Sequence, residues 1–117
     1  MTPKAAIQKG KDLENYVAEQ IAAKGIDTRA KRSFGSGNGN TEKSDIWTNM
    51  QVLGLQAGIE CKHATKYSVH DWWRQTKKLE SLGYEPILVI KQTHEQYGDT
   101  KAIIYLDTLL ELIKATK

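Results

Sequence analysis

The chain has 117 residues, of which 39% are apolar, 26% charged and 8% aromatic. These values are typical of one folded domain and exclude a globally disordered chain. The longest apolar run, residues 86–90, is far shorter than the ~20 residues that cross a bilayer, and no secretory leader is visible. A single cysteine, Cys61, excludes an internal disulfide and a four-cysteine zinc site. We therefore expect an intracellular, cytoplasmic protein with no membrane partner.

The net charge is +3, from 17 Lys and Arg against 14 Asp and Glu. Most of the basic side chains lie in the first 43 residues and between residues 62 and 91, whereas the C-terminal quarter is nearly neutral. This distribution permits a basic face that binds nucleic-acid phosphates. It is equally compatible with an ordinary solvated surface.

The first half of the chain predicts one helix and three short strands. Apolar side chains recur at helical spacing over residues 5–24, with Glu14 at the border of the apolar stripe. Residues 27–34 predict a short basic edge strand. Residues 35–43 predict a flexible glycine-rich loop, whose backbone N–H groups could bind phosphate or merely connect two elements.

The next two strands are predicted over residues 44–48 and 58–62. We expect them to form an antiparallel hairpin in which Asp45 lies opposite Glu60. The turn of that hairpin would then be centred between residues 52 and 53.

The second half predicts a helix over residues 68–82, ended by Gly83, and a strand over residues 86–90 that is covered on both faces. A further strand over residues 102–106 precedes a last short helix that starts at Asp107. The apolar side chains that we expect to face inward from this helix are Leu109, Leu110, Leu112 and Ile113. The order α-β-β-β-α-β-β-α predicts an α/β domain, a central mixed sheet flanked by helices.

The most informative residues are Asp45 and the run Glu60-Cys61-Lys62. Side chains alternate along a strand, so Glu60 and Lys62 share one face, and the hairpin would bring Asp45 to them. Two adjacent carboxylates repel one another unless a cation lies between them, and carboxylate oxygens suit Mg²⁺ or Mn²⁺. An exposed strand with an ordinary Glu–Lys ion pair would give the same short pattern.

Asp45 followed by Glu60-Cys61-Lys62 resembles the active-site pattern of the PD-(D/E)XK nuclease superfamily, which has the restriction-endonuclease-like fold. More narrowly, the chain resembles archaeal-type Holliday junction resolvases, which also occur in viruses and phages. The other matching features are Gly10-x-x-x-Glu14, Ser36-Gly37 with Asn38 in place of a second serine, Ser44-Asp45-Ile46 with serine in place of proline, and Gln75.

The resemblance implies an Mg²⁺ ion, replaceable by Mn²⁺, held by Asp45, Glu60 and the backbone carbonyl of Cys61. Glu14 would join through a metal-bound water or a second metal. Lys62 would position the attacking water or stabilise charge on the phosphate. The implied activity is hydrolysis of DNA phosphodiesters at a four-way junction.

Two further site residues are implied by the same resemblance. Ser36 would contact the scissile strand, and Gln75 would orient the nucleophile or a neighbouring base. Two symmetric cuts imply a homodimer, whose apolar interface the second or the last helix could supply. The residues that we expect to contact DNA are Lys11, Lys31, Arg32, Ser36, Lys66, Arg74 and Lys77.

Several alternatives remain open on the sequence. The protein could be another nuclease of the same fold, of the repair, nicking or restriction type, or a non-catalytic DNA-binding module. Cys61 with His63 could form a thiol nucleophile, although their strand face should be core. Trp72 and Trp73 could stack on bases, or could pack within the core or across a dimer.

Overall fold

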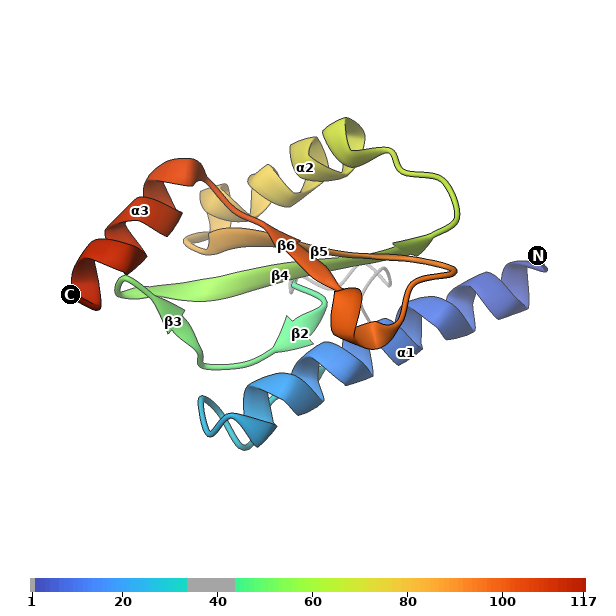
Figure 1. Ribbon diagram of the computed structural model, residues 1–117, viewed down its shortest axis with the longest axis horizontal. Coiled ribbons are helices and arrows are strands. Elements are labelled where there is room, and N and C mark those ends of the chain that lie inside the picture. The colour runs from blue at the N-terminus through green and yellow to red at the C-terminus, as the bar shows by residue number, and fades with distance from the viewer. Residues whose placement is uncertain (1, 34–43) are drawn as a thin grey trace.

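The computed structural model describes residues 2–33 and 44–117, which form an α/β fold with three α-helices and a mixed sheet (Figure 1). The four-stranded sheet has the order β3-β4-β5-β6. Strands β4 and β5 run parallel, and the other two pairs are antiparallel. These strands are β3 (Gln51–Val52), β4 (Leu55–Ala64), β5 (Glu85–Gln92) and β6 (Lys101–Ile103). A separate antiparallel pair consists of β1 (Lys31–Arg32) and β2 (Ile46–Trp47).

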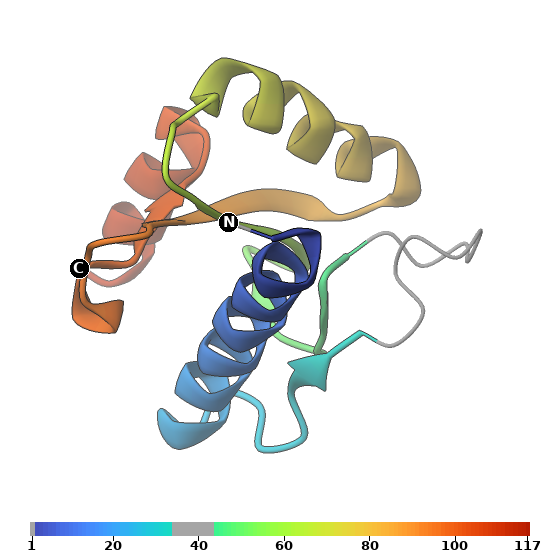
Figure 2. The same ribbon diagram turned by 90° about the vertical axis from the view of Figure 1, so that its right-hand side faces the viewer.

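Helices cover both faces of the sheet. Helix α1 (Pro3–Ala23) lies below the sheet in Figures 1 and 2, and α2 (Val69–Lys77) lies above it. The 3-10 helix η1 (Lys78–Leu82) continues α2, and a second one, η2 (Tyr97–Asp99), precedes β6. Helix α3 (Leu106–Ala115) ends the chain. None of the helices in these two described segments is long and apolar enough to cross a membrane.

The main core lies between α1 and the central strands. Leu13 is completely buried, and it packs in one cluster with Ile46, Ile59, Cys61 and Val89. The alternating side chains Leu88 and Ile90 of β5 are buried on the other face, towards Leu79. Both faces of β5 are therefore covered, which confirms the expectation for residues 86–90 and explains their unbroken apolar run.

The hairpin before β4 differs from the expected one. Its turn consists of Leu53 and Gly54, both with positive φ (53° and 89°), and Val52 pairs with Leu55. Two successive positive φ values suit the two-residue turn that matches strand twist. The turn is thus displaced by one residue from the expected centre. An additional strand, β3, also makes the observed order α-β-β-β-β-α-β-β-α, so the predicted order was one strand short.

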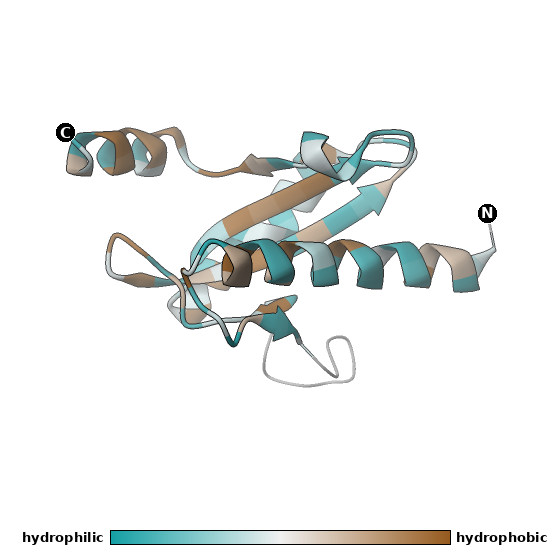
Figure 3. Ribbon diagram, turned by 60° about the horizontal axis from the view of Figure 1, so that its bottom comes forward, coloured by the Kyte–Doolittle hydropathy of each residue, from teal (hydrophilic) through white to brown (hydrophobic). Residues whose placement is uncertain are grey.

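The last helix also corrects the prediction. Its apolar side chains were expected to face inward, but Leu109, Leu110 and Ile113 are 43%, 53% and 48% exposed. The helix starts at Leu106, after Tyr105, rather than at an Asp107 cap. Figure 3 shows α3 set apart from the rest of the chain, with brown, apolar residues along it. Amphipathic spacing therefore identified the helix correctly but not the surface that its apolar stripe covers.

Gly58 gives a test of how closely η1 and the following loop pack on β4. A Cβ placed on Gly58 would lie 2.6 Å from Tyr84 Cβ and 3.2 Å from Leu79 Cδ1. We predict that Gly58→Ala lowers the free energy of unfolding by about 1–3 kcal/mol because the added methyl group overpacks this contact. Urea denaturation measures the change.

Gly10 provides the matched control, since a Cβ there meets nothing within 4 Å. It lies inside helix α1, so Gly10→Ala should raise the free energy of unfolding by about 0.5–1 kcal/mol. Equal effects at the two glycines would contradict the packing described for Gly58.

Candidate active site

Strand β4 carries Glu60 and Lys62 on one face. Lys62 Nζ lies 3.5 Å from Glu60 Oε1, and their side chains are 28% and 21% exposed. The neighbours Ile59 and Cys61 point to the opposite face and are buried in the core between the sheet and α1. The alternation of the strand therefore places a half-buried ion pair opposite an apolar core, as the sequence predicted.

Asp45 lies against the edge of β4 that β5 does not occupy. Its backbone N–H donates to the Ile59 carbonyl (2.7 Å), and its Oδ2 accepts a hydrogen bond from the Cys61 N–H (2.8 Å). The buried Ser44 hydroxyl accepts from the Ile59 N–H (2.9 Å) and donates to the Ile46 carbonyl (2.9 Å). Asp45 thus approaches the middle of β4 as expected, although it adjoins Ile59 and Cys61 instead of pairing with Glu60.

The same edge also presents the carbonyl of Cys61. In a strand, the N–H and C=O groups of one residue point to the same side, and the Cys61 N–H points at Asp45. The Cys61 carbonyl therefore faces the side of β4 where Asp45 lies. This direction agrees with the role that the resemblance gives to that carbonyl.

Helix α1 and strand β1 complete the cluster with Glu14 and Arg32. Arg32 Nε donates to Glu14 Oε1 at 3.3 Å, and the two side chains are only 21% and 14% exposed. Glu14 acts electrostatically on Glu60, and it is itself affected by Asp45. The sequence predicted that Arg32 contacts DNA, and the structure places its side chain inside the acidic cluster, as the partner of Glu14.

The turn after α1 fixes the far end of β2. Asp27 is buried, and its carboxylate accepts hydrogen bonds from the Thr48 hydroxyl (2.7 Å) and from the backbone N–H of Asn49 (2.9 Å) and Arg29 (3.0 Å). These bonds tie the residue after β2 to the end of α1. They help to hold Asp45, at the start of the same segment, against β4.

Burial raises the pKa values of all three clustered carboxyl groups. The pKa of Glu60 rises from an ordinary value of 4.5 to about 7, chiefly through desolvation and then through the Asp45 carboxylate, while Lys62 partly opposes the rise. Desolvation also raises the pKa of Glu14 and of Asp45, and for Glu14 the charge of Asp45 adds to it. The Asp45 carboxylate therefore makes both glutamates harder to ionise, and Glu14 adds to this effect at Glu60.

The cluster fits a hard divalent cation. When ionised, Glu14, Asp45 and Glu60 carry three negative charges, against two positive charges on Arg32 and Lys62. Mg²⁺ commonly binds through one or two carboxylates and completes its octahedral shell with water and phosphate oxygens. Within the described residues no three Asp, Glu, His or Cys side chains converge as a ready-made set of metal ligands. Asp45 and Glu60, with the Cys61 carbonyl, are the groups that would hold the ion.

A pocket of about 360 Å³ adjoins this cluster on the α2 face of the sheet. Glu60 lines it together with Gln75, so these two predicted site residues share one pocket. Pocket walls also come from Lys78, Leu79, Ser81 and Leu82 of η1, which the sequence analysis did not single out. Ser36 and the predicted loop over residues 35–43 lie outside the described residues.

Among the other basic residues assigned to DNA contacts, Lys11 lies close enough to Glu14 to oppose the rise in its pKa. Lys31 lies over the Trp47 ring, 5.4 Å from its centroid, and Arg74 forms an exposed ion pair with Asp71 at 3.5 Å. The remaining three, Lys11, Lys66 and Lys77, are exposed on α1, on the loop after β4 and on α2.

The structure gives little support to the thiol alternative. Cys61 is buried, and desolvation raises the pKa of its thiol well above the usual range. His63 lies two residues along β4, where its Nδ1 is 3.2 Å from the Lys9 carbonyl. A nucleophilic cysteine needs a lowered pKa and a base that reaches it.

The aromatic residues of α2 make contacts within the chain. The Trp72 ring lies edge-on to Tyr67 with centroids 5.9 Å apart, and the Trp73 ring lies edge-on to Tyr105 at 5.2 Å. Packing therefore accounts for both tryptophans.

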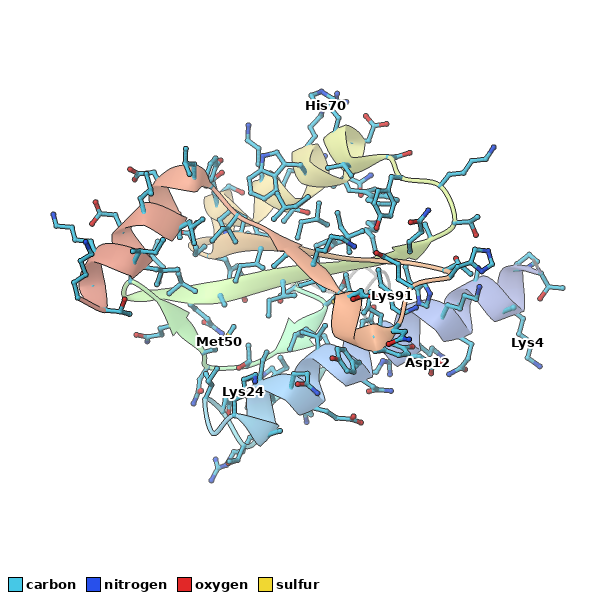
Figure 4. The ribbon with its side chains drawn as sticks, viewed as in Figure 1. Lys4, Asp12, Lys24, Met50, His70 and Lys91 are labelled. Atoms are coloured by element: carbon cyan, nitrogen blue, oxygen red, sulfur yellow. The ribbon has the colours of Figure 1, made fainter. Side chains whose placement is uncertain are left out.

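Figure 4 shows His70 pointing away from the sheet, on the outer side of α2, while Lys91 lies towards α1. Lys91 is 4% exposed, and its Nζ lies 4.7 Å from the Tyr97 ring centroid.

The raised pKa of Glu60 predicts how stability depends on pH in the absence of divalent ions. Between pH 4.5 and 7 the folded chain retains a proton on Glu60 that the unfolded chain has released. The free energy of unfolding should therefore fall by about 1–3 kcal/mol as the pH rises through that range. Chemical denaturation in EDTA measures the slope.

Glu60→Gln should remove most of this fall because the amide does not titrate. Glu19→Gln, an exposed change on α1, is the matched control and should leave the slope as in the wild type. A fall of the same size in Glu60→Gln and wild type would contradict the burial of this carboxyl group.

In comparisons with known proteins, no family model matches the chain, and neither the curated proteins nor the solved structures give a significant match. The resemblance to junction resolvases therefore depends on the residues and on the geometry described above.

Proposed function

We propose that this chain is a Mg²⁺-dependent endonuclease with a restriction-endonuclease-like fold, and that it cuts branched DNA at four-way junctions. The observation that carries the proposal is the gathering of Asp45, Glu60 and Lys62 at one place on β4, with Glu14 beside them. These are the residues that the resemblance requires, and they come from three separate segments of the chain. A mixed sheet covered by α1 and α2 is consistent with that fold.

The proposed chemistry is hydrolysis of a phosphodiester bond. Mg²⁺, or Mn²⁺ in its place, would supply an acidified water molecule and a positive charge next to the phosphate when bound at Asp45 and Glu60. The Lys62 ammonium then stabilises the negative charge that grows on the phosphate oxygens. Glu14 would hold water at the edge of the site, and Arg32 orients the Glu14 carboxylate and opposes the rise in its pKa.

The substrate is recognised through its backbone and its shape. Lys11, Lys66, Arg74 and Lys77 present positive charge from three elements, α1, the loop after β4 and α2. Such contacts fix the position of a duplex without reading its base sequence. Selectivity for a branch then comes from the geometry at which duplex arms leave the site.

The proposed enzyme acts as a homodimer, with α3 as its interface. Resolution of a four-way junction needs two symmetric cuts, and one chain holds one cluster of this kind among its described residues. The stripe Leu106, Leu109, Leu110 and Ile113 is exposed, whereas the tryptophans of α2 are already packed. Antiparallel pairing of two α3 helices would bury the stripe and bring Lys114 near the partner's Asp107. The exposed stripe therefore favours α3 over α2 as the dimer interface.

Cleavage assays test the nuclease activity. The wild type should cut a four-way junction with Mg²⁺ or Mn²⁺, and it should cut matched linear, nicked and flap DNA more slowly. Asp45→Asn should lower the cleavage rate about a thousandfold, because the amide binds a divalent ion poorly yet still accepts a hydrogen bond. Asp99→Asn, an exposed change in η2, should retain wild-type activity.

Three outcomes separate the alternatives. Unchanged cleavage by Asp45→Asn would remove this residue from the centre. Equal cutting of all four DNA structures would support a different nuclease of the same fold. Junction binding by a wild type that never cuts would support a DNA-binding module.

The dimer prediction is tested by light scattering. Leu110→Glu places a charge at the centre of the proposed interface in both copies. It should weaken association about a hundredfold, since each buried carboxylate loses its water. Leu53→Glu is the matched control, because Leu53 is 49% exposed in the hairpin turn. A wild-type protein that stays monomeric at high concentration would contradict the interface.

A further inference from the structure

The 360 Å³ pocket beside Glu60 has no part in the hydrolysis described above. Its lining comes from β4 and the α2–η1 segment. Helix α2 lies on the face of the sheet opposite α1 (Figure 2). Glu60 forms one wall, Gln75 comes from α2, and the rest of the lining comes from η1. The pocket therefore opens directly beside the carboxyl group that would hold the metal ion.

The pocket combines an apolar floor with polar groups at its sides. Leu79 is almost fully buried (3% exposed), whereas Leu82 is 51% exposed although it lines the same cavity. Gln75 supplies an amide that both donates and accepts hydrogen bonds, and Lys78 supplies an ammonium donor. A matching ligand presents an apolar surface to the two leucines and carries hydrogen-bonding groups for Gln75 and Lys78.

We infer that this pocket receives a single unstacked nucleobase from the DNA strand whose phosphate lies at the acidic cluster. The inference rests on the proposed function for the phosphate position. Successive nucleotides of one strand are spaced by about 3.4 Å along a duplex axis, so a neighbour of that phosphate reaches a wall shared with Glu60. The volume lies at the lower end of the range for small-molecule sites, which suits one base and excludes a base pair with its backbone.

The pocket also accounts for a preference for branched DNA. A base must leave its stack to enter such a pocket, and the cost is lowest where pairing is already disturbed. The nucleotides at a junction meet that condition, whereas those of an uninterrupted duplex do not. Hydrophobic contact with Leu79 and Leu82 and hydrogen bonds to Gln75 then replace the lost stacking and pairing.

The test uses 2-aminopurine placed next to the branch point of a four-way junction, because its fluorescence rises when the base leaves the stack. The measurement is made in EDTA, so no cleavage takes place. Binding of the wild type should raise the fluorescence severalfold. In Leu82→Trp, which fills the pocket from a half-exposed position, the rise should be lost and the affinity for the junction should fall about tenfold.

Ile26→Trp is the matched control. Ile26 is 52% exposed, close to the value for Leu82, but lies in the loop after α1. It should bind the junction and raise the fluorescence as the wild type does, and thermal melting should show that both variants fold. A fluorescence rise that persists in Leu82→Trp, or that is missing while the wild type is bound to the junction, would overturn the inference.

The two proposals fail in different ways. A protein that raises the fluorescence but never cuts with Mg²⁺ would contradict the proposed activity and support the nucleobase site. A protein that cuts junctions without any fluorescence rise would support the proposed activity and contradict the nucleobase site. If the chain binds no DNA, titration with deoxyadenosine monophosphate, followed by NMR, decides. Changes in the amide chemical shifts of residues 75–82 would support the nucleobase site, and the absence of such changes would contradict it.

Discussion

The short segment that precedes β2 docks on the free edge of β4 through two backbone positions, and the candidate centre depends on this docking. Asp45 donates from its backbone to Ile59 and accepts with its carboxylate from Cys61. One residue thus satisfies backbone groups that would otherwise be left unpaired on a central strand. The same bonds fix the Asp45 carboxylate beside Glu60. Structural and proposed catalytic roles therefore coincide in one side chain.

The electrostatics of the cluster follow from that placement. Three carboxyl groups lie in surroundings that disfavour their ionisation, and the pKa of Glu60 rises to about 7 as a result. The two nearby cations, Arg32 and Lys62, compensate the charge only in part. Such an arrangement is costly for the folded chain, and a divalent ion at the proposed site would relieve that cost. This free-energy cost distinguishes the cluster from an ordinary solvated surface.

Much of the architecture could be predicted because periodicity and stop signals are local. The helix over residues 5–24, the helix ended by Gly83 and the buried strand at 86–90 all follow from such signals. The approach of Asp45 to Glu60 and Lys62 could also be predicted, because strand alternation and a hairpin leave few other arrangements. The predicted position of the turn before β4 was wrong by one residue. The observed turn, Leu53-Gly54, needs a positive φ at Leu53, which a leucine rarely adopts and the sequence does not indicate.

The missing information was mostly tertiary. Nothing local distinguishes an apolar stripe that faces a core from one that faces outward, and so the leucines of α3 were misplaced. The partnership of Arg32 with Glu14 joins residues from β1 and α1, whose packing no spacing rule specifies. The pocket walls in η1 escaped notice for the same reason. A shift from α-helix to 3-10 helix after Lys77 is a tertiary adjustment of a continuous helical pattern.

The parallel pairing of β4 with β5 has a consequence for biosynthesis. Glu14, Asp45, Glu60 and Lys62 all precede α2 in the chain, yet β4 gains its second neighbour only when β5 arrives from beyond it. A ribosome therefore releases these four side chains before the scaffold that aligns them can close. Non-local closure of this kind is slow compared with helix formation. Under the proposed function, the nascent polypeptide would not cut nucleic acids until the domain is nearly whole.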